Sequence, residues 1–304
     1  MGELDVRVQP AAPAMRWREV FSAYLALTKP GIISLLLITT VPTMILAQRG
    51  IPSPWLMFAT VLGGTLAAGG ANAINCYVDR DIDEIMHRTR GRPLPMGKVD
   101  PASALVFALG LEVAAFLMLA LAADLLAAIL AFSAAAFYVL VYTMWLKRTT
   151  PQNIVIGGAA GAMPPLVAWA AVRGDVGWPA VVLFAIIFFW TPPHFWALSI
   201  KYRDDYARAG VPMLPVVASL HETKKQIFVY AALLMPVSLA LYATGTVGWL
   251  YAVAAAALGG VFVWKAWRLR GDDRPGAAMR VFTFSLLYLS LIFLAVGIDP
   301  LILR

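Results

Sequence analysis

Three oxygen-bearing side chains, Asn75, Asp79 and Asp83, recur at intervals of four residues in the segment NCYVDRDIDEIMHRTRGRP, residues 75–93. An α-helix turns by about 100° per residue, so side chains four apart lie on one face. Hard divalent cations such as Mg²⁺ take carboxylate and amide oxygens as ligands and share the metal with substrate phosphates. This acidic stripe therefore predicts a site for a Mg²⁺–diphosphate complex. Asp81 lies between the stripe positions and is expected to face elsewhere.

Four arginines accompany the acidic stripe in the same segment: Arg80, Arg88, Arg90 and Arg92. Guanidinium groups donate forked hydrogen bonds to phosphate oxygens, so these residues are candidates for diphosphate binding. The alternative is a solvated loop in which acids and arginines neutralise one another at a membrane surface. Carboxylates held close together raise the free energy of the protein unless a cation neutralises them. The spacing of the stripe therefore favours a metal site over a solvated loop, and both interpretations stay open.

A second group of candidate residues lies in the segment TPPHFWALSIKYRDDYARAGVPMLPV, residues 191–216. His194 is the only histidine within an apolar span, where ionisable side chains usually face the protein interior or a cavity. Pro192 and Pro193 remove two backbone donors, which predicts a bend or a break in the helix and room for a ligand. The histidine can ligate a metal, carry a proton or serve as a hydrogen-bonding core residue, and these roles stay open. Lys201, Arg203, Asp204 and Asp205 follow at the predicted inner boundary of the membrane.

These candidate residues are set in a chain with the composition of an integral membrane protein. Hydrophobic residues make up 61% of the 304 residues and charged residues only 13%, a balance that a soluble domain does not reach. A helix that crosses the hydrocarbon layer needs roughly 20 apolar residues, and such runs recur along the chain. We place them near Gly31–Gln48, Pro54–Cys76, Ala102–Ala123, Leu125–Trp145, Gln152–Val172, Trp178–Ile200, Ile227–Thr246, Gly248–Trp264 and Val281–Ile298. The prediction is an all-α, polytopic membrane fold of nine transmembrane helices.

The distribution of basic residues orients this prediction. With the N-terminus in the cytoplasm, 21 of the 24 Lys and Arg residues fall in cytoplasmic segments, and only Arg49, Arg173 and Arg304 fall outside. This asymmetry follows the positive-inside rule, so the net charge of +7 reflects topology and argues against binding to nucleic acid. We divide the chain into a flexible cytoplasmic tail, residues 1–20, and a membrane domain, residues 21–304. Cys76 is the only cysteine, which excludes an intramolecular disulfide and a thiolate metal cluster.

Several of these segments together resemble one known family. The spacing Asn75-x3-Asp79-x3-Asp83, followed by arginines and the RPLP segment of residues 92–95, resembles the signature of the UbiA superfamily of intramembrane prenyltransferases. The strings TPPHFW and AGVPMLPV are similar to one branch of it, the protohaem IX farnesyltransferases or haem O synthases. PQNIVIGGAAGAMPPLVAWAA (residues 151–171) and LTKPGI (residues 27–32) resemble the same branch. The resemblance extends from about Leu27 to the last predicted helix.

The resemblance implies nine helices around a central cavity, with farnesyl diphosphate bound through Mg²⁺ at two cytoplasmic loops and its tail buried among the helices. The implied activity is farnesyl transfer to a vinyl group of haem B, with addition of water, which gives haem O and diphosphate. The implied catalytic residues are Asn75, Asp79, Asp83, Lys201 and Asp205, and the implied metal ligands are Asn75, Asp79, Asp83, Asp204 and Asp205. The implied diphosphate ligands are Arg80, Arg88, Arg90, Arg92, Lys201 and Arg203, and His194 is the implied contact for haem.

Asp204 and Asp205 depart from the pattern of the superfamily, whose second loop often carries spaced aspartates. Adjacent residues of a helix point roughly 100° apart, so a symmetric second metal site is not expected here. We expect one of the two aspartates to bind metal while Lys201 or Arg203 holds the diphosphate.

Two other functions compete with this interpretation. A sister enzyme acting on 4-hydroxybenzoate, a naphthoate or a chlorophyllide is disfavoured by His194 and the Ala209–Pro215 segment. A transporter or channel would place ionisable residues near the middle of the bilayer. Here nearly all ionisable residues lie at the inner rim of the membrane, and Glu112 is the exception. The expected location is the bacterial cytoplasmic (inner) membrane, with the active site near the cytoplasmic face. A downstream haem-modifying membrane enzyme is a candidate partner.

Overall fold

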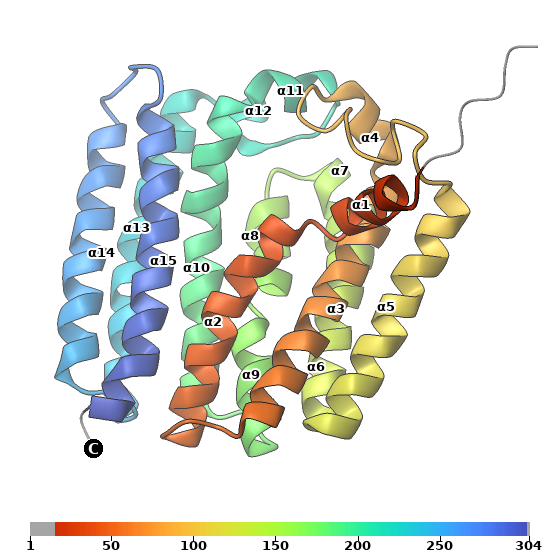
Figure 1. Cartoon of the computed structure of the whole chain (residues 1–304). Coiled ribbons are helices and arrows are strands. Elements are labelled where there is room, and N and C mark those ends of the chain that lie inside the picture. The colour runs from red at the N-terminus through yellow and green to blue at the C-terminus, as the bar shows by residue number, and fades with distance from the viewer. Residues whose placement is uncertain (1–15, 303–304) are drawn as a thin grey trace, which may run out of the picture.

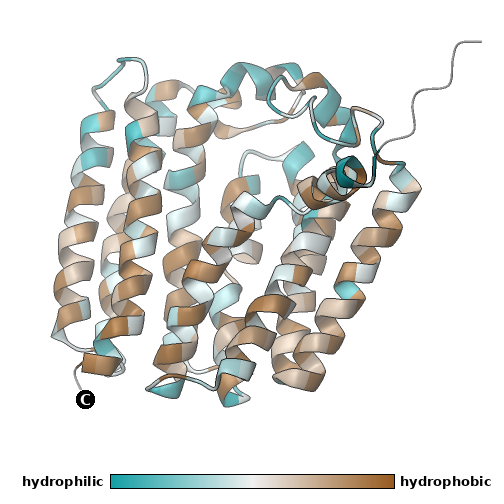
Figure 2. Ribbon diagram, viewed as in Figure 1, coloured by the Kyte–Doolittle hydropathy of each residue, from teal (hydrophilic) through white to brown (hydrophobic). Residues whose placement is uncertain are grey.

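Long apolar helices make up most of the structure, a computed structural model that describes residues 16–302. Eight helical segments are long and apolar enough to cross a membrane, and no strand occurs in the described range. They are α3 (Pro54–Val78), α5 (Pro101–Ala122), α6 (Leu125–Ala136) continued by the π-helix η1 (Phe137–Leu146) and α7 (Lys147–Thr149), α8 (Asn153–Gly161) with α9 (Pro164–Arg173), α10 (Trp178–Lys201), α13 (Leu220–Ala243), α14 (Trp249–Leu269) and α15 (Ala277–Ile302). They stand in one bundle (Figure 1), and apolar residues cover their middle parts (Figure 2). The predicted all-α membrane fold is confirmed.

The first predicted crossing corresponds to α2 (Pro30–Gln48), which packs in the same bundle against α3, α9 and α15. Its apolar stretch, Ile33–Gln48, is shorter than the eight spans. The number of crossings, the side of the membrane on which the N-terminus lies and the central cavity therefore stay predictions. Helix α1 (Trp17–Leu27) begins within the predicted tail, and the first 15 residues lie outside the described range.

Polar side chains mark where the helices begin. Asp124 separates α5 from α6, and its carboxylate accepts a hydrogen bond from the Leu126 N–H at 2.7 Å. Ser53, Asp100 and Ser219 cap α3, α5 and α13 in the same way. A helix start without such a cap leaves N–H groups unpaired, which is costly beside hydrocarbon. The predicted separation of two crossings by Asp124 is confirmed.

Helix α10 runs without a break from Trp178 to Lys201, through Pro192 and Pro193. Of the predicted bend or break at these prolines, the break is therefore wrong, and the bend stays a prediction. Both prolines are buried, and the packing of α10 against α8, α13 and α15 offsets the backbone hydrogen bonds that they remove. A break occurs instead between α8 and α9, where Pro164 and Pro165 begin a new helix.

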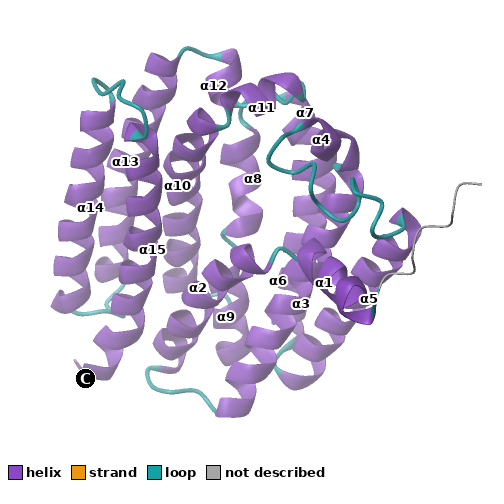
Figure 3. Ribbon diagram, turned by 45° about the horizontal axis from the view of Figure 1, so that its top comes forward, coloured by secondary structure: helices purple, strands orange, loops and turns teal. Residues whose placement is uncertain are grey.

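Two long connections meet at one end of the bundle, which we call the loop end and which lies at the top of Figure 1. The first follows α3 and contains α4 (Arg80–Ile85), and the second follows α10 and contains α11 (Arg203–Arg208) and α12 (Leu214–Val217). Figure 3, in which this end is turned forward, shows α4, α7 and α11 gathered there. Charged segments far apart in the sequence are thereby brought to one place.

Small residues allow α3 to approach α5 closely. A Cβ atom at Gly70 would lie 2.9 Å from the carbonyl oxygen of Ala108 and 2.7 Å from Oε1 of Glu112. Membrane helices commonly associate through such small residues, because hydrocarbon offers no hydrophobic drive for their packing. The contact fixes α3 one turn before Asn75, at the approach to the loop end.

Gly70→Ala should lower the free energy of unfolding by about 1–3 kcal/mol, because the added methyl group forces α3 and α5 apart. Gly64→Ala on the same helix is the matched control, since a Cβ atom there meets nothing within 4 Å. Alanine favours helix more than glycine does, so the control should be neutral or stabilising. Thermal unfolding in detergent micelles measures both variants, and equal losses of stability would contradict the close α3–α5 contact.

Candidate active site

The acidic stripe lies where α3 ends and α4 begins. Asn75 is in the last turn of α3, Asp79 joins the two helices and Asp83 is in α4. The backbone N–H of Asp79 donates to the Asn75 carbonyl at 2.9 Å, and that of Asp83 donates to the Asp79 carbonyl at 2.8 Å. The helical spacing thus continues through the junction. All three side chains are buried.

Asn75 holds the centre of a hydrogen-bond network. Its Nδ2 donates to Asp79 Oδ2 at 2.7 Å and to Thr143 Oγ1 at 3.0 Å, and its Oδ1 accepts from Lys29 Nζ at 2.5 Å. The ammonium group on one side and the carboxylate on the other fix which end of the amide is oxygen. The amide oxygen of Asn75 therefore points toward the cation, and its nitrogen toward Asp79.

Asp79 is a fully buried carboxylate with unequal oxygens. Its Oδ2 is paired with Lys147 and accepts from Asn75, whereas its Oδ1 accepts no hydrogen bond from any described residue. Arg148 lies 3.7 Å from Oδ1. A buried acceptor without a donor costs free energy, so Oδ1 is an atom to which a ligand of positive charge can bind favourably.

Sequence reasoning missed three residues of this network: Lys29, Thr143 and Lys147 were not among the predicted site residues. Burial disfavours the charged form of Lys29 and lowers its pKa to about 8. The backbone of Lys29 has a φ of 54°, the left-handed region that side chains other than glycine rarely adopt and that is often found at functional sites. The one available signal was the position of Lys29 in the LTKPGI segment, directly before a predicted span.

Asp83 pairs with an arginine of its own loop. Arg92 donates from one terminal nitrogen to both carboxylate oxygens of Asp83, at 2.9 and 2.7 Å. Asp83 is buried, while the Arg92 side chain is about one quarter exposed, at 26%. The pair places the Arg92 guanidinium beside the stripe, and the binding of diphosphate by Arg92 stays a prediction.

The second loop contacts the first through Asp205. The backbone N–H of Arg88 donates to Asp205 Oδ2 at 3.3 Å, and Asp205 is also paired with Arg208. The Arg88 guanidinium donates to Tyr206 Oη at 3.4 Å and lies 5.3 Å from the centre of the Tyr202 ring. Burial raises the pKa of Tyr206, so its hydroxyl stays protonated. Arg88 and Asp205 therefore hold the two loops face to face.

The other predicted site residues lie outside this buried group. Arg80, Arg90, Lys201, Arg203 and Asp204 are exposed. Arg80 donates to the Tyr77 carbonyl at 2.7 Å and so turns away from the stripe. Asp204 is exposed whereas Asp205 is buried, so in the described structure the second loop brings one buried carboxylate to the first, in agreement with the expected asymmetry. The five exposed residues stay candidates by sequence alone.

Asp81, which was expected to face away from the stripe, does so. Its carboxylate accepts two hydrogen bonds from Arg148, at 2.7 and 2.8 Å, and its side chain is 60% exposed. These hydrogen bonds lower the pKa of Asp81 to about 2. Asp81 and Asp79 therefore share Arg148, but only Asp79 belongs to the buried network.

The donor atoms of the stripe suit a metal that is shared with a ligand. The described residues contain no group of three or more His, Cys, Asp or Glu side chains placed to enclose a metal ion. Mg²⁺ binds through one or two carboxylates and completes its shell with substrate phosphates and water. Asp79 and Asp83, with an unpartnered oxygen on Asp79, meet that requirement, so the residues fit Mg²⁺ only together with a diphosphate. The predicted metal ligands Asn75, Asp79, Asp83, Asp204 and Asp205 stay a prediction.

His194 lies seven residues before the end of α10, about 10 Å below the loop end. Its ring stacks between Trp190, with ring centres 4.1 Å apart, and Phe282, at 4.6 Å. Its Nδ1 lies 2.6 Å from Ser285 Oγ, and that hydroxyl donates to the Phe282 carbonyl at 2.6 Å. The single proton of the Ser285 hydroxyl has two acceptors within reach, the Phe282 carbonyl and Nδ1. When it donates to the carbonyl, Nδ1 is the donor to Ser285 Oγ and Nε2 keeps its lone pair.

Comparison with known proteins places the chain among membrane prenyltransferases. The family model described as "UbiA prenyltransferase family" matches residues 36–292. The "Protoheme IX farnesyltransferase" of Gloeobacter violaceus is 56% identical over 281 residues, which cover 92% of each chain. The "Protoheme IX farnesyltransferase 1" of Saccharopolyspora erythraea is 53% identical over 294 residues, which cover 95% of this chain and 94% of the relative.

Solved structures with a similar fold are more distant in sequence. A structure of digeranylgeranylglyceryl phosphate synthase superposes with a TM-score of 0.77 at 19% identity, covering 93% of this chain and 99% of that one. A UbiA homologue from Archaeoglobus fulgidus, bound to DMAPP and Mg²⁺, superposes with a TM-score of 0.64 at 15% identity, covering 90% and 99%. At these identities the likeness establishes the fold alone.

Lys147→Met should destabilise the protein by about 3 kcal/mol, because it leaves the buried carboxylate of Asp79 without its cation. The double variant Asp79→Asn/Lys147→Met removes both charges and should regain most of that loss. Unfolding in mixed detergent micelles measures the three proteins. If the double variant is as unstable as the single one, Lys147 contributes packing and not charge compensation.

Proposed function

The chain belongs to the UbiA prenyltransferase family, and on that premise we propose that it transfers a farnesyl group from farnesyl diphosphate to a vinyl group of haem B. Water adds in the same reaction, and the products are haem O and diphosphate. The observation that carries this proposal is the match to relatives named protoheme IX farnesyltransferase, at 56% and 53% identity over more than nine tenths of the chain. The two loops that meet at the loop end supply the charged groups that such a reaction needs.

The diphosphate is proposed to bind between the two loops. Arg88 and Arg92 are placed beside Asp205 and Asp83, and the exposed Lys201 and Arg203 lie at the start of the second loop. Arginine offers planar, forked donors and lysine a mobile ammonium group, which together can follow a diphosphate as negative charge moves onto it. Arg80 and Arg90 are also candidates, but Arg80 donates to the Tyr77 carbonyl and so turns away from the stripe.

Asn75, Asp79 and Asp83 are proposed to hold Mg²⁺ together with that diphosphate, with Asp205 or Asp204 contributing from the second loop. The chemistry that Mg²⁺ supplies when bound is the neutralisation of charge on the leaving diphosphate. The Archaeoglobus fulgidus homologue, which holds Mg²⁺ together with DMAPP, supports this proposal. Lys147 and Arg92 pair with these carboxylates in the described structure, so they can turn toward phosphate oxygens when a metal takes the carboxylates.

The reaction begins with rupture of the allylic C–O bond of farnesyl diphosphate, and the bonding electrons leave with the diphosphate. The terminal carbon of a haem vinyl group then forms a bond to the farnesyl cation. This leaves positive charge on the carbon next to the porphyrin, where water adds and loses a proton to give the hydroxyl group. The cationic residues at the loop end stabilise the departing diphosphate, and the apolar helices exclude water from the first cation.

His194 is the proposed contact for haem. In the tautomer in which Nδ1 donates to Ser285, Nε2 keeps the lone pair that an iron ligand requires. The rings of Trp190, His194 and Phe282 form an aromatic stack about 10 Å from the charged rim. A planar macrocycle and a charged diphosphate are thereby separated along α10.

We further propose that the loop end faces the cytoplasm in a bacterial inner membrane, as the distribution of Lys and Arg indicates. Haem O leaves this enzyme with a farnesyl tail that keeps it in or beside the bilayer. A downstream membrane enzyme that modifies haem is therefore the proposed recipient.

Asp79→Asn should lower the rate of haem farnesylation by roughly 100-fold or more, because the variant removes the anionic oxygen proposed for metal binding. The purified protein is supplied with haem B, farnesyl diphosphate and Mg²⁺, and the porphyrin product is followed by mass spectrometry. A product heavier than haem B by farnesyl plus water is expected. EDTA should abolish it, and added Mg²⁺ should restore it.

Asp81→Asn is the matched control, since it changes the same type of residue two positions away on an exposed carboxylate. Its activity should stay within about twofold of the unchanged protein. Equal losses in the Asp79 and Asp81 variants would contradict the buried metal site. If the protein prenylates an aromatic acid and gives no haem product, the proposed metal site stands and the enzyme belongs to a sister branch of the family.

His194→Ala should weaken haem binding and remove the absorption bands of histidine-ligated iron, and Ser285→Ala should weaken binding by about 10-fold. The serine variant keeps the imidazole but loses the hydrogen bond that sets its tautomer. Titration of the purified protein with haem B, followed by absorption spectroscopy, measures both. His221→Ala is the control, because His221 is exposed at the start of α13. An unchanged spectrum in His194→Ala would exclude iron ligation.

A further inference from the structure

Helix α14 stands at one edge of the bundle (Figure 1) and carries a stripe of exposed apolar residues. It packs against α13 and α15, and Val253, Ala257, Val261 and Trp264 lie on its free face at intervals of four and three residues. Val253, Val261 and Trp264 are 58, 40 and 50% exposed. The stripe continues to Arg268 and rises about 22 Å, more than the roughly 15 Å of one leaflet, so it is long enough to contact a whole acyl chain.

The stripe ends in a group of aromatic and basic side chains at the loop end. The Arg268 guanidinium lies 5.1 Å from the centre of the Trp264 ring, and that of Arg270 lies 5.1 Å from the Phe228 ring. Trp267, 56% exposed, lies between the two arginines on the helix. A pocket of about 760 Å³ opens here, and its lining includes Trp267, Arg268, Arg270 and the loop that follows α14.

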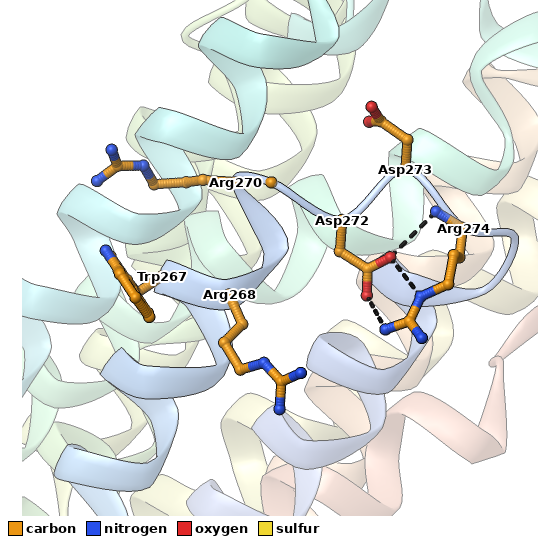
Figure 4. Close-up of a pocket in the computed structure, with 7 residues that line it drawn as sticks. Trp267, Arg268, Arg270, Asp272, Asp273 and Arg274 are labelled. Atoms are coloured by element: carbon orange, nitrogen blue, oxygen red, sulfur yellow. Dashed lines mark hydrogen bonds and ion pairs between the residues drawn. The ribbon is translucent and has the colours of Figure 1, made fainter.

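Arg268 and Arg270 differ from the other cations of this pocket in having no acidic partner. Asp272 is paired with Arg274 and Arg280, both at 2.8 Å, and Asp273 is paired with Lys224 at 2.5 Å. Figure 4 shows the bonds between Asp272 and Arg274, whereas Arg268 and Arg270 extend away from both aspartates. Among the described residues, no carboxylate lies within 4.0 Å of either guanidinium. Their charges are thus available to an anion from outside the chain.

We propose that this end of α14 binds an anionic phospholipid, with the phosphate of its headgroup on Arg268, an acyl chain along the Val253–Trp264 face, and Arg270 adding positive charge on the neighbouring side of the helix, where it lies over Phe228 of α13. Arginine donates bidentate hydrogen bonds to phosphate, and exposed tryptophans lie at the level of headgroups in membrane proteins. A free phosphate would bind the arginines but would make no contact with the apolar stripe. The apolar face continues through Trp264 to the unpaired Arg268 on one side of the helix, which favours a lipid. This site is independent of the proposed farnesyl transfer.

The test is native mass spectrometry of the delipidated, full-length protein in detergent, titrated with phosphatidylglycerol. The double variant Arg268→Gln/Arg270→Gln should bind the first lipid about 20-fold more weakly, since each basic residue near the membrane surface contributes to binding of anionic lipid. Arg49→Gln/Arg173→Gln, which removes two exposed arginines from the opposite end of the bundle, should bind it as the unchanged protein does.

Three comparisons decide the proposal. Phosphatidylcholine should bind more weakly than phosphatidylglycerol to the unchanged protein, and equal binding would overturn the role of charge. Glycerophosphoglycerol, the headgroup without acyl chains, and inorganic phosphate should bind far more weakly than the lipid. If either binds as well, the arginines form a site for free phosphate and the lipid proposal fails. Equal losses in the two double variants would show a general effect of net charge and would also overturn it.

Discussion

The buried carboxylate of Asp79 determines how the loop end is assembled. A charge removed from water costs several kcal/mol unless a partner of opposite charge lies close to it. Lys147 pairs with it directly, and Asn75 links it to Lys29. The start of α2, the junction of α3 with α4 and the end of η1 must therefore meet at one point.

The π-helix η1 explains how its residues reach this point. Thr143 Oγ1 donates to the Tyr138 carbonyl, five residues earlier, at 2.9 Å, and Thr143 also accepts from Asn75. A wider helical turn changes the direction in which the following side chains point, and such turns are frequent at functional sites. Tyr138 and Tyr142 stack with ring centres 5.4 Å apart, and Gly157 of α8 leaves space for the Tyr142 ring. Packing against α8 thus supports the shape that presents Thr143 and Lys147 to the stripe.

Two chemically different regions follow one another along α10. At the loop end, Arg88 and Asp205 join the two connections, and Lys29, Lys147 and Arg92 contact the acidic stripe. About 10 Å deeper, His194 lies between Trp190 and Phe282, on a helix that its prolines do not interrupt. A continuous α10 holds the histidine at a fixed depth below the charged rim. This separation suits a reaction whose leaving group is an anion and whose acceptor is a planar, apolar ring system.

The sequence by itself determined the class of fold, the positions of the spans and the helical spacing of Asn75, Asp79 and Asp83, because these depend on the hydrophobicity and periodicity of neighbouring residues. The sequence also contains the segments that resemble a known family. Only the tertiary structure decided which cations meet the stripe: Lys29 lies 46 residues from Asn75, and Lys147 lies 68 residues from Asp79. Local patterns carry no information on such distant pairs, which depend on helix packing and on the cost of leaving a buried charge unpaired. For the same reason, packing kept α10 continuous where its prolines predicted a break.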